Sequence, residues 1–305
     1  MSPMQKTSNR DTVFPGSGGD YLANIQRPNN SNLPESQVES STRHSRALVK
    51  STTKSGLRDL YLPLKYKTQR VNWREDSPWS FYEGAYRIEL GGSVAVVLRS
   101  DTGEQFTLSS ASITEEQIKR LCELKHKNLV QTYEVFSYEG VYYTVSNHEA
   151  ISLNHFIACD KSLNEAQLAS IFAQSLEGIA YLATHGLRHS EIICPNILVS
   201  LEGVVKIANL ELCQNGARAP AKQDLAALGS AVMSVMNKKH VEKGKFSIMN
   251  PSLWSSEAIS FLSLTMDSTY EALSSHSFLD LAKPQYLPWI VLYALRKAHN
   301  AVAPI

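Results

Sequence analysis

The chain has 305 residues, of which 43% are hydrophobic, and this predicts a globular protein of one or two domains. Its formal net charge of +1 gives no overall attraction to nucleic acid or to a membrane. The charge is uneven, because residues 1–70 carry eleven Lys and Arg against five Asp and Glu. No run of eighteen apolar residues and no secretory signal occurs, so we expect a cytoplasmic or nuclear protein without a transmembrane segment.

Residues 1–56 are rich in Ser, Asn, Pro, Thr and Gly and lack apolar periodicity, which predicts a disordered basic tail. Such a tail is either a solvated linker or a contact for an acidic membrane surface or a partner. Residues 57–80 regain apolar and aromatic side chains. We therefore interpret 57–80 as a segment that docks on the folded domain, on the side of its first lobe.

The first half of the folded region alternates apolar and polar residues between turns, the pattern of antiparallel strands. Predicted strands cover residues 86–90, 94–98, 105–109, 130–136 and 141–145, with a helix at 113–124. The second half is mostly helical. Helices are predicted at 163–183, 222–236, 256–266, 278–282 and 288–302, and a hairpin at 197–199 and 204–208. The fold class that follows is α+β.

Polar residues surround this hairpin. His189, Glu191 and Asn196 precede its first strand, and Asn209 follows its second. The spacing resembles the catalytic loop and the metal-binding loop of a protein kinase, H-R-D-L-x-x-x-N and D-F-G. On that frame Glu191 falls at the catalytic base, and Asn196 and Asn209 fall at the metal ligands. His189 is either a core hydrogen-bonding residue or a catalytic one, and Ser190 replaces the Arg.

The resemblance covers residues 82–300, and the C-terminal LAKPQYLPWI is similar to that of PAK-type kinases of the STE group. It implies a two-lobed domain at 81–300. The N-lobe, 81–148, would hold a five-stranded antiparallel sheet and one helix, and the C-lobe, 149–300, would be mostly helical. The activation segment is shortened, since only nine residues separate Leu212 from Lys222.

The resemblance also implies a degenerate nucleotide site. Only the last glycine of the family's glycine-rich loop remains, Ser109 replaces the lysine that pairs with phosphates, and Gln117 replaces that lysine's glutamate partner. The implied positions of this degenerate ATP site are Gly92, Val94, Thr107, Ser109, Gln117 and Leu198. We expect no bound cofactor.

Two structural expectations accompany the family frame. A column of side chains that joins the lobes can be assembled from Leu121, Thr132, Leu210 and His189, with Asp224 beneath it holding the catalytic-loop backbone. Loss of the activation segment should also expose apolar surface between the loop 189–196 and the helix that starts at Lys222.

The favoured interpretation is a catalytically inactive pseudokinase that acts as a scaffold or allosteric partner of signalling proteins, an active kinase among them, without binding nucleic acid. The alternative is a divergent serine/threonine kinase that uses ATP and Mg²⁺, with Glu191 as base. A third hypothesis is a nucleotide sensor that binds ATP without using it. Ser109, Asn209 and the missing segment favour the first.

Overall fold

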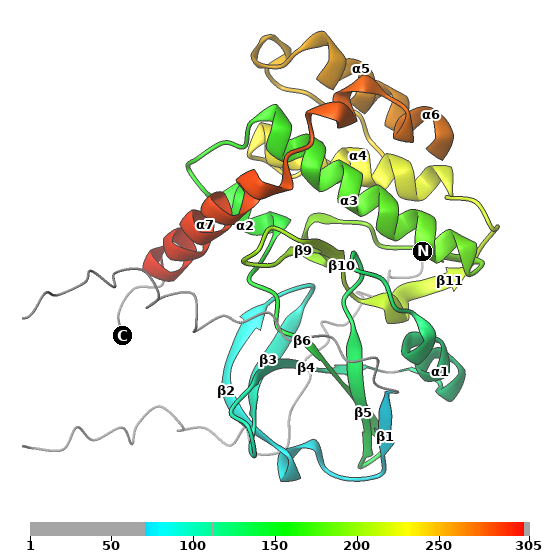
Figure 1. The fold of residues 1–305 in the computed structure, drawn as a ribbon, viewed down its shortest axis with the longest axis vertical. Helices are drawn as coiled ribbons and strands as arrows, with labels where there is room; N and C mark the ends of the chain where they lie inside the picture. The colour runs from blue at the N-terminus through cyan, green and yellow to red at the C-terminus, as the bar shows by residue number, and fades with distance from the viewer. Residues whose placement is uncertain (1–70, 112, 302–305) are drawn as a thin grey trace, which may run out of the picture. The chain divides into compact units, whose positions relative to one another are not determined.

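The computed structural model describes residues 71–111 and 113–301 (Figure 1). The predicted tail 1–56 and residues 57–70 of the predicted docking segment lie outside this range. The described part is α+β, with a β-sheet at the N-terminal side and helices towards the C-terminus, as predicted. None of its helices is long and apolar enough to cross a lipid bilayer.

The N-lobe is built on a six-stranded sheet with the order β1-β5-β6-β4-β3-β2. The strands are β1 (Asn72–Arg74), β2 (Tyr82–Glu89), β3 (Ser93–Arg99), β4 (Gln105–Ala111), β5 (Thr132–Tyr138) and β6 (Val141–Asn147). The five predicted antiparallel strands are confirmed. The sixth, β1, was not predicted, and it adds to the edge of the sheet in parallel with β5.

Helix α1 (Glu115–Glu123) lies in the N-lobe and begins with a capping box. The Thr114 side chain accepts the Gln117 N–H, and the Gln117 side chain accepts the Thr114 N–H. This reciprocal bonding satisfies two of the donors that a helix N-terminus leaves unpaired. Ile118 and Leu121 are buried, so α1 is fixed to the lobe by its apolar face.

The C-lobe is organised around α3 (Glu165–Thr184) and α4 (Lys222–Asn237). The other helices are α2 (Leu153–Ala158), α5 (Ser256–Thr265), α6 (Tyr270–Ser274) and α7 (Leu287–Ala301). The strands are β7 (Ile151–Ser152), β8 (Leu187–His189), β9 (Ile197–Val199), β10 (Val205–Ile207) and β11 (Cys213–Asn215). Residues 278–282, predicted as α-helix, fall within a 3-10 helix, Ser277–Leu281. Helices α2 and α6 were not predicted.

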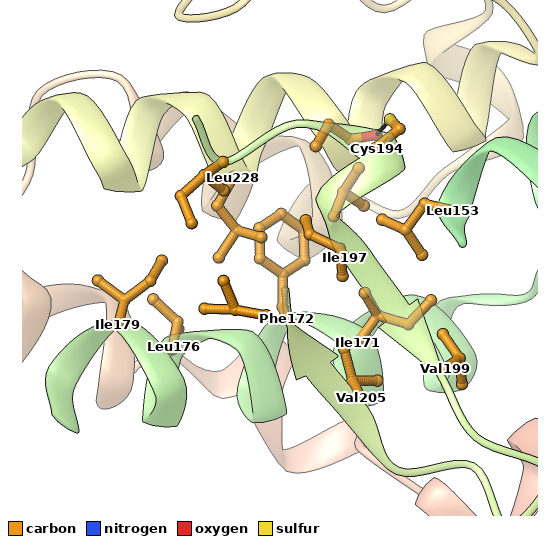
Figure 2. Packing of buried hydrophobic residues seen from close by; sticks show 14 of the residues in the cluster. Leu153, Ile171, Phe172, Leu176, Ile179, Cys194, Ile197, Val199, Val205 and Leu228 are labelled. Carbon is orange, nitrogen blue, oxygen red and sulfur yellow. Dashed lines mark hydrogen bonds between the residues drawn. The ribbon is translucent and has the colours of Figure 1, made fainter. Parts of the chain in front are cut away.

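The core of the C-lobe lies between α3, α4 and the β9–β10 hairpin (Figure 2). Phe172 and Leu176 of α3 and Leu228 of α4 approach Ile197 and Val205 of the hairpin. Each of these side chains is buried. Because the hairpin is packed between two long helices, the polar residues just before and just after it are held in place.

Candidate functional site

His189 is a buried cross-link at the end of β8. Its backbone N–H donates to Asp224 Oδ2 at 3.0 Å. Its ring Nε2 lies 2.9 Å from the carbonyl oxygen of Ala208, which can only accept, and its Nδ1 accepts the N–H of Glu191 at 3.1 Å. The ring is therefore neutral, and burial lowers the pKa of His189. Both ring nitrogens are used inside the protein.

Asp224 projects from the first turn of α4 and holds the loop from below, as predicted. Its carboxyl group is buried. Burial raises the pKa of Asp224 from its ordinary value of 3.8 to about 6, while the hydrogen bond from His189 and the charge of Arg188 oppose the rise. The Asp224 carboxyl group therefore accepts a hydrogen bond from the loop backbone, but burial removes part of its hydration and destabilises its charged form.

Glu191, at the predicted base position, forms an ion pair with Lys243. The Lys243 Nζ lies 2.9 Å from Glu191 Oε1 and also donates to the Ser190 carbonyl at 2.9 Å. Lys243 belongs to the loop that follows α4, and we did not predict it. No local pattern could have indicated this contact, because 52 residues separate the two partners. The base position thus keeps a carboxylate with a cation beside it.

The two residues at the predicted metal positions bond to each other. Asn209 Nδ2 donates to Asn196 Oδ1 at 3.0 Å, and Asn196 Nδ2 donates to the Glu191 carbonyl at 2.9 Å. Asn209 Nδ2 also donates to the carbonyl of Gly91 in the turn between β2 and β3. Mg²⁺ prefers carboxylate and carbonyl oxygens, whereas both of these side chains are neutral, their Nδ2 groups donate, and Asn196 Oδ1 already accepts a hydrogen bond. Nowhere in the described ranges do three or more His, Cys, Asp or Glu side chains cluster as metal ligands.

Ser109 and Gln117 are engaged with different partners. Ser109 Oγ and Thr144 Oγ1 form a hydrogen bond of 2.8 Å between the paired strands β4 and β6. Gln117 Nε2 donates to the Glu211 carbonyl at 3.2 Å, which links α1 to the segment after β10. A neutral serine and a neutral amide therefore stand where the family pairs a lysine with a glutamate.

Apolar side chains line the predicted nucleotide position. Val94 and Leu198 contribute to one buried cluster, as expected, and the two further members are Leu90 and Ala208. Leu90 was not predicted as a site residue, because in the sequence it reads only as the end of a strand. Beside the cluster, Thr107 Oγ1 lies 3.3 Å from His148 Nδ1, and burial lowers the pKa of His148 to about 4.

A cavity of about 50 Å³ remains next to this cluster. Much of its lining is polar, from Thr107, Ser109, Thr132, Thr144, Ser146 and Asn147. Pockets that bind small molecules and cofactors measure roughly 300–1,000 Å³. The cavity has room for a few water molecules and is several times too small for a nucleotide. Of the predicted site residues, Ser109 and Asn209 are neutral and supply no charge to a phosphate or a metal ion.

The shortened segment after Asn209 pairs directly with the loop. Strand β11 runs antiparallel to β8, with Cys213 opposite His189. Ser190 Oγ donates to the Leu212 carbonyl at 2.9 Å. The expectation of exposed apolar surface between 189–196 and Lys222 stays a prediction, although β11 and Lys243 contact the loop on this side. Large exposed apolar side chains of the described chain lie elsewhere, among them Phe246, Met249, Leu253, Trp289 and Leu292.

Comparisons with known proteins agree with this geometry. Residues 81–248, more than half of the chain, match the family described as protein tyrosine and serine/threonine kinase. The chain is 28% identical over 136 residues to serine/threonine-protein kinase SMU1 of Mycosarcoma maydis, covering 44% of this chain and 18% of that protein. It is 32% identical over 158 residues to cyclin-dependent kinase 12 of Caenorhabditis elegans (43% and 20%). It is 31% identical over 147 residues to serine/threonine-protein kinase shk1/pak1 of Schizosaccharomyces pombe (45% and 22%). The chain thus spans about a fifth of the length of these relatives.

Proposed function

The chain belongs to the protein tyrosine and serine/threonine kinase family, and we propose that it is a catalytically inactive member, a pseudokinase. In this role the fold is kept as a binding surface for other signalling proteins. The observation that supports the proposal is the small size of the cavity at the predicted nucleotide position, about 50 Å³, which the buried cluster of Leu90, Val94, Leu198 and Ala208 lines.

The polar groups of the site support the same conclusion. Phosphoryl transfer depends on placing and neutralising phosphate charge, by a lysine and by metal ions on carboxylate ligands. Here Ser109 bonds to Thr144, and the Asn209 amide donates to Asn196. Neither residue offers a charge to a phosphate or a metal ion. Because each lost charged contact is worth about 1.5–3 kcal/mol, affinity for Mg²⁺-ATP should fall by about tenfold or more per contact.

We also propose the branch of the kinase family to which the chain belongs and the kind of protein that it binds. The similarity of the C-terminal segment to PAK-type kinases, together with the match to shk1/pak1, supports a PAK-like origin in the STE group. A pseudokinase of this kind would act as scaffold or allosteric partner, and we propose an active kinase as its partner. The ion pair between Lys243 and Glu191 places a cation on the carboxylate at the predicted base position, which supports an inactive role.

Two measurements test the proposal. The first is the melting temperature of the full chain with millimolar ATP, with and without Mg²⁺ or Mn²⁺. A ligand that binds only the folded state and is present at about 100 times its Kd stabilises it by about 2.7 kcal/mol, so ATP binding would raise the melting temperature. Because we propose that ATP does not bind, we expect no rise. The second is transfer of radiolabelled phosphate to the chain itself and to a generic protein substrate, with an active kinase as positive control. We expect no transfer.

Either result can refute the proposal. A melting temperature that rises by several degrees with ATP, while phosphate transfer stays absent, would indicate a nucleotide sensor. Phosphate transfer that disappears in Glu191→Ala would indicate a divergent kinase. Loss of transfer in that variant, with an unchanged melting temperature, would identify Glu191 as the base and exclude an effect through folding.

A further inference from the structure

The turn between β2 and β3 makes a direct hydrogen bond to the other lobe. The carbonyl oxygen of Gly91 accepts from Asn209 Nδ2, across a sequence separation of 118 residues. The contact is close, since a Cβ added to Gly91 would lie 2.9 Å from Asn209 Nδ2, a distance that real Cβ atoms essentially never show. The φ angle of Gly91 is +73°, in the region that favours glycine. Both features restrict this position to glycine.

The residue before Gly91 adds an apolar contact between the lobes. Leu90 is 4% exposed and joins Val94 of the N-lobe to Leu198 and Ala208 of the C-lobe. The turn itself is tight, because the Leu90 N–H donates to the Gly92 carbonyl at 2.9 Å. This hydrogen bond fixes the backbone of Leu90 while its side chain is buried in the cluster. Its burial stabilises the contact of the two lobes without any ligand.

Hydrogen bonds extend from this turn into the C-lobe. Asn209 donates at once to Gly91 and to Asn196 Oδ1, and Asn196 donates to the Glu191 carbonyl. Asn209 itself has φ 56° and ψ 47°, which is a left-handed backbone conformation. Two residues further on, Gln117 of α1 donates to the Glu211 carbonyl. The N-lobe is therefore bonded twice to the segment that follows β10.

We propose that residues 90–92 and Asn209 form an interlobe latch, which holds the two lobes in their closed arrangement without a bound ligand. In proteins that close around a ligand, the closed state is favoured by contacts that the ligand makes with both parts. Here the turn makes those contacts itself, with Leu90 inside and Gly91 bonded to Asn209. The inference rests on the proposed function, because a chain that binds no nucleotide can hold its two lobes together only with its own residues.

The test compares amide hydrogen exchange of the full chain and its variants in the absence of nucleotide. Gly91→Ala introduces both the strain of a positive φ and a clash with Asn209. Gly103→Ala is the matched control, because Gly103 has φ +70° in the turn between β3 and β4 and has no atom within 4 Å of an added Cβ. Asn209→Gly removes the amide but keeps a residue that tolerates the left-handed backbone.

We expect Gly91→Ala and Asn209→Gly to exchange about tenfold faster than wild type over residues 86–97 and 205–214, and Gly103→Ala to match wild type there. Adding Gly91→Ala to Asn209→Gly should cause a smaller change than Gly91→Ala causes in wild type, because the clash with the Asn209 side chain is gone and only the strain of the positive φ remains. If Gly91→Ala unfolds the whole chain, Asn209→Gly still carries the test, since it introduces no clash.

Two results would overturn the latch. One is equal exchange in Gly91→Ala and Gly103→Ala, together with wild-type exchange in Asn209→Gly. The other is full additivity of Gly91→Ala and Asn209→Gly, which would mean that the two positions act independently. Failure of the proposed function is distinguishable from both, because phosphate transfer by the wild-type chain is measured separately and with nucleotide present.

Discussion

Replacing Asp224 by asparagine should change how the stability of the chain depends on pH. The Asp224 carboxyl group is buried on α4 and accepts the His189 N–H at 3.0 Å. An asparagine oxygen can accept the same hydrogen bond in nearly the same place, but it cannot bind or release a proton. Asp224→Asn therefore removes the titration of this group and keeps its contact with the loop.

The sign follows from the pKa of Asp224, which burial raises from its ordinary value of 3.8 to about 6 in the folded state. The folded chain binds this proton more tightly than the unfolded chain. The stabilising contribution of the group is therefore fully present below about pH 4 and is lost as the pH rises through about 6. Two pKa units correspond to about 3 kcal/mol in full, of which about 1.4 kcal/mol falls between about pH 5 and pH 8.

Urea unfolding of wild type and Asp224→Asn over this pH range provides the measurement. The difference between the two chains isolates Asp224 from the other groups that titrate, and it should move in favour of the variant by about 1–1.5 kcal/mol between about pH 5 and pH 8. Asp224→Ala is the control, because it also removes the titration but leaves the buried His189 N–H unpaired. It should cost about 1–3 kcal/mol more than Asp224→Asn at every pH. A pH-independent difference between wild type and Asp224→Asn would refute the reasoning.

Three further changes have defined expectations. His148→Gln should change the pH dependence of stability in the opposite direction to Asp224→Asn. Burial lowers the pKa of His148 to about 4, so the stability that neutral His148 contributes is lost as the pH falls from about 6.5 towards 4. The unfolding free energy of His148→Gln should therefore rise relative to wild type at low pH. Gly229→Ala should lower the unfolding free energy by about 1–3 kcal/mol, because the added Cβ would lie 2.0 Å from Thr265 Oγ1, and an unchanged Tm would contradict this contact. Lys206→Met should destabilise by about 3–5 kcal/mol in chemical unfolding, since it leaves the buried Glu149 carboxyl group without the partner now 2.6 Å away, and burial already raises the pKa of Glu149. Adding Glu149→Leu should restore most of that loss, and a double variant as unstable as Lys206→Met alone would contradict the reasoning.

The elements that could be predicted are those whose signals are local. Alternation between turns indicated the strands β2 to β6. The helix predicted at 163–183 corresponds to α3, whose N-terminus Asn164 caps by accepting the Gln167 N–H. The missed elements are short. Strand β1 has three residues, α2 has six and α6 has five. Segments of this length complete less than two periods, so their structure depends on the surfaces that they meet.

Some contacts around the loop could be predicted and others could not. The sequence placed His189, Glu191 and Asn196 close together before one strand, and it indicated that Asp224 would hold this loop. It gave no indication that Lys243 would pair with Glu191, or that Leu90 would join Val94 and Leu198 in one cluster. Such partners are brought together by packing between distant segments, for which no sequence period exists.

The residues that replace the family's charged groups at this site share one property, which is that their side chains are neutral. Positions 109 and 209 are half-buried, and their hydrogen-bond partners Thr144, Asn196 and Gly91 are neutral. A lysine at 109 or a carboxylate at 209 would lose part of its hydration beside these neutral partners, at a cost in free energy. The residues present avoid that cost. Ser109 is satisfied by Thr144, Gln117 by a carbonyl oxygen and Asn209 by two neutral acceptors. Neutral side chains that bond to one another need no nucleotide to compensate them, which agrees with the function that we propose. The one carboxylate that remains, Glu191, is partly exposed and has acquired a lysine from another part of the chain.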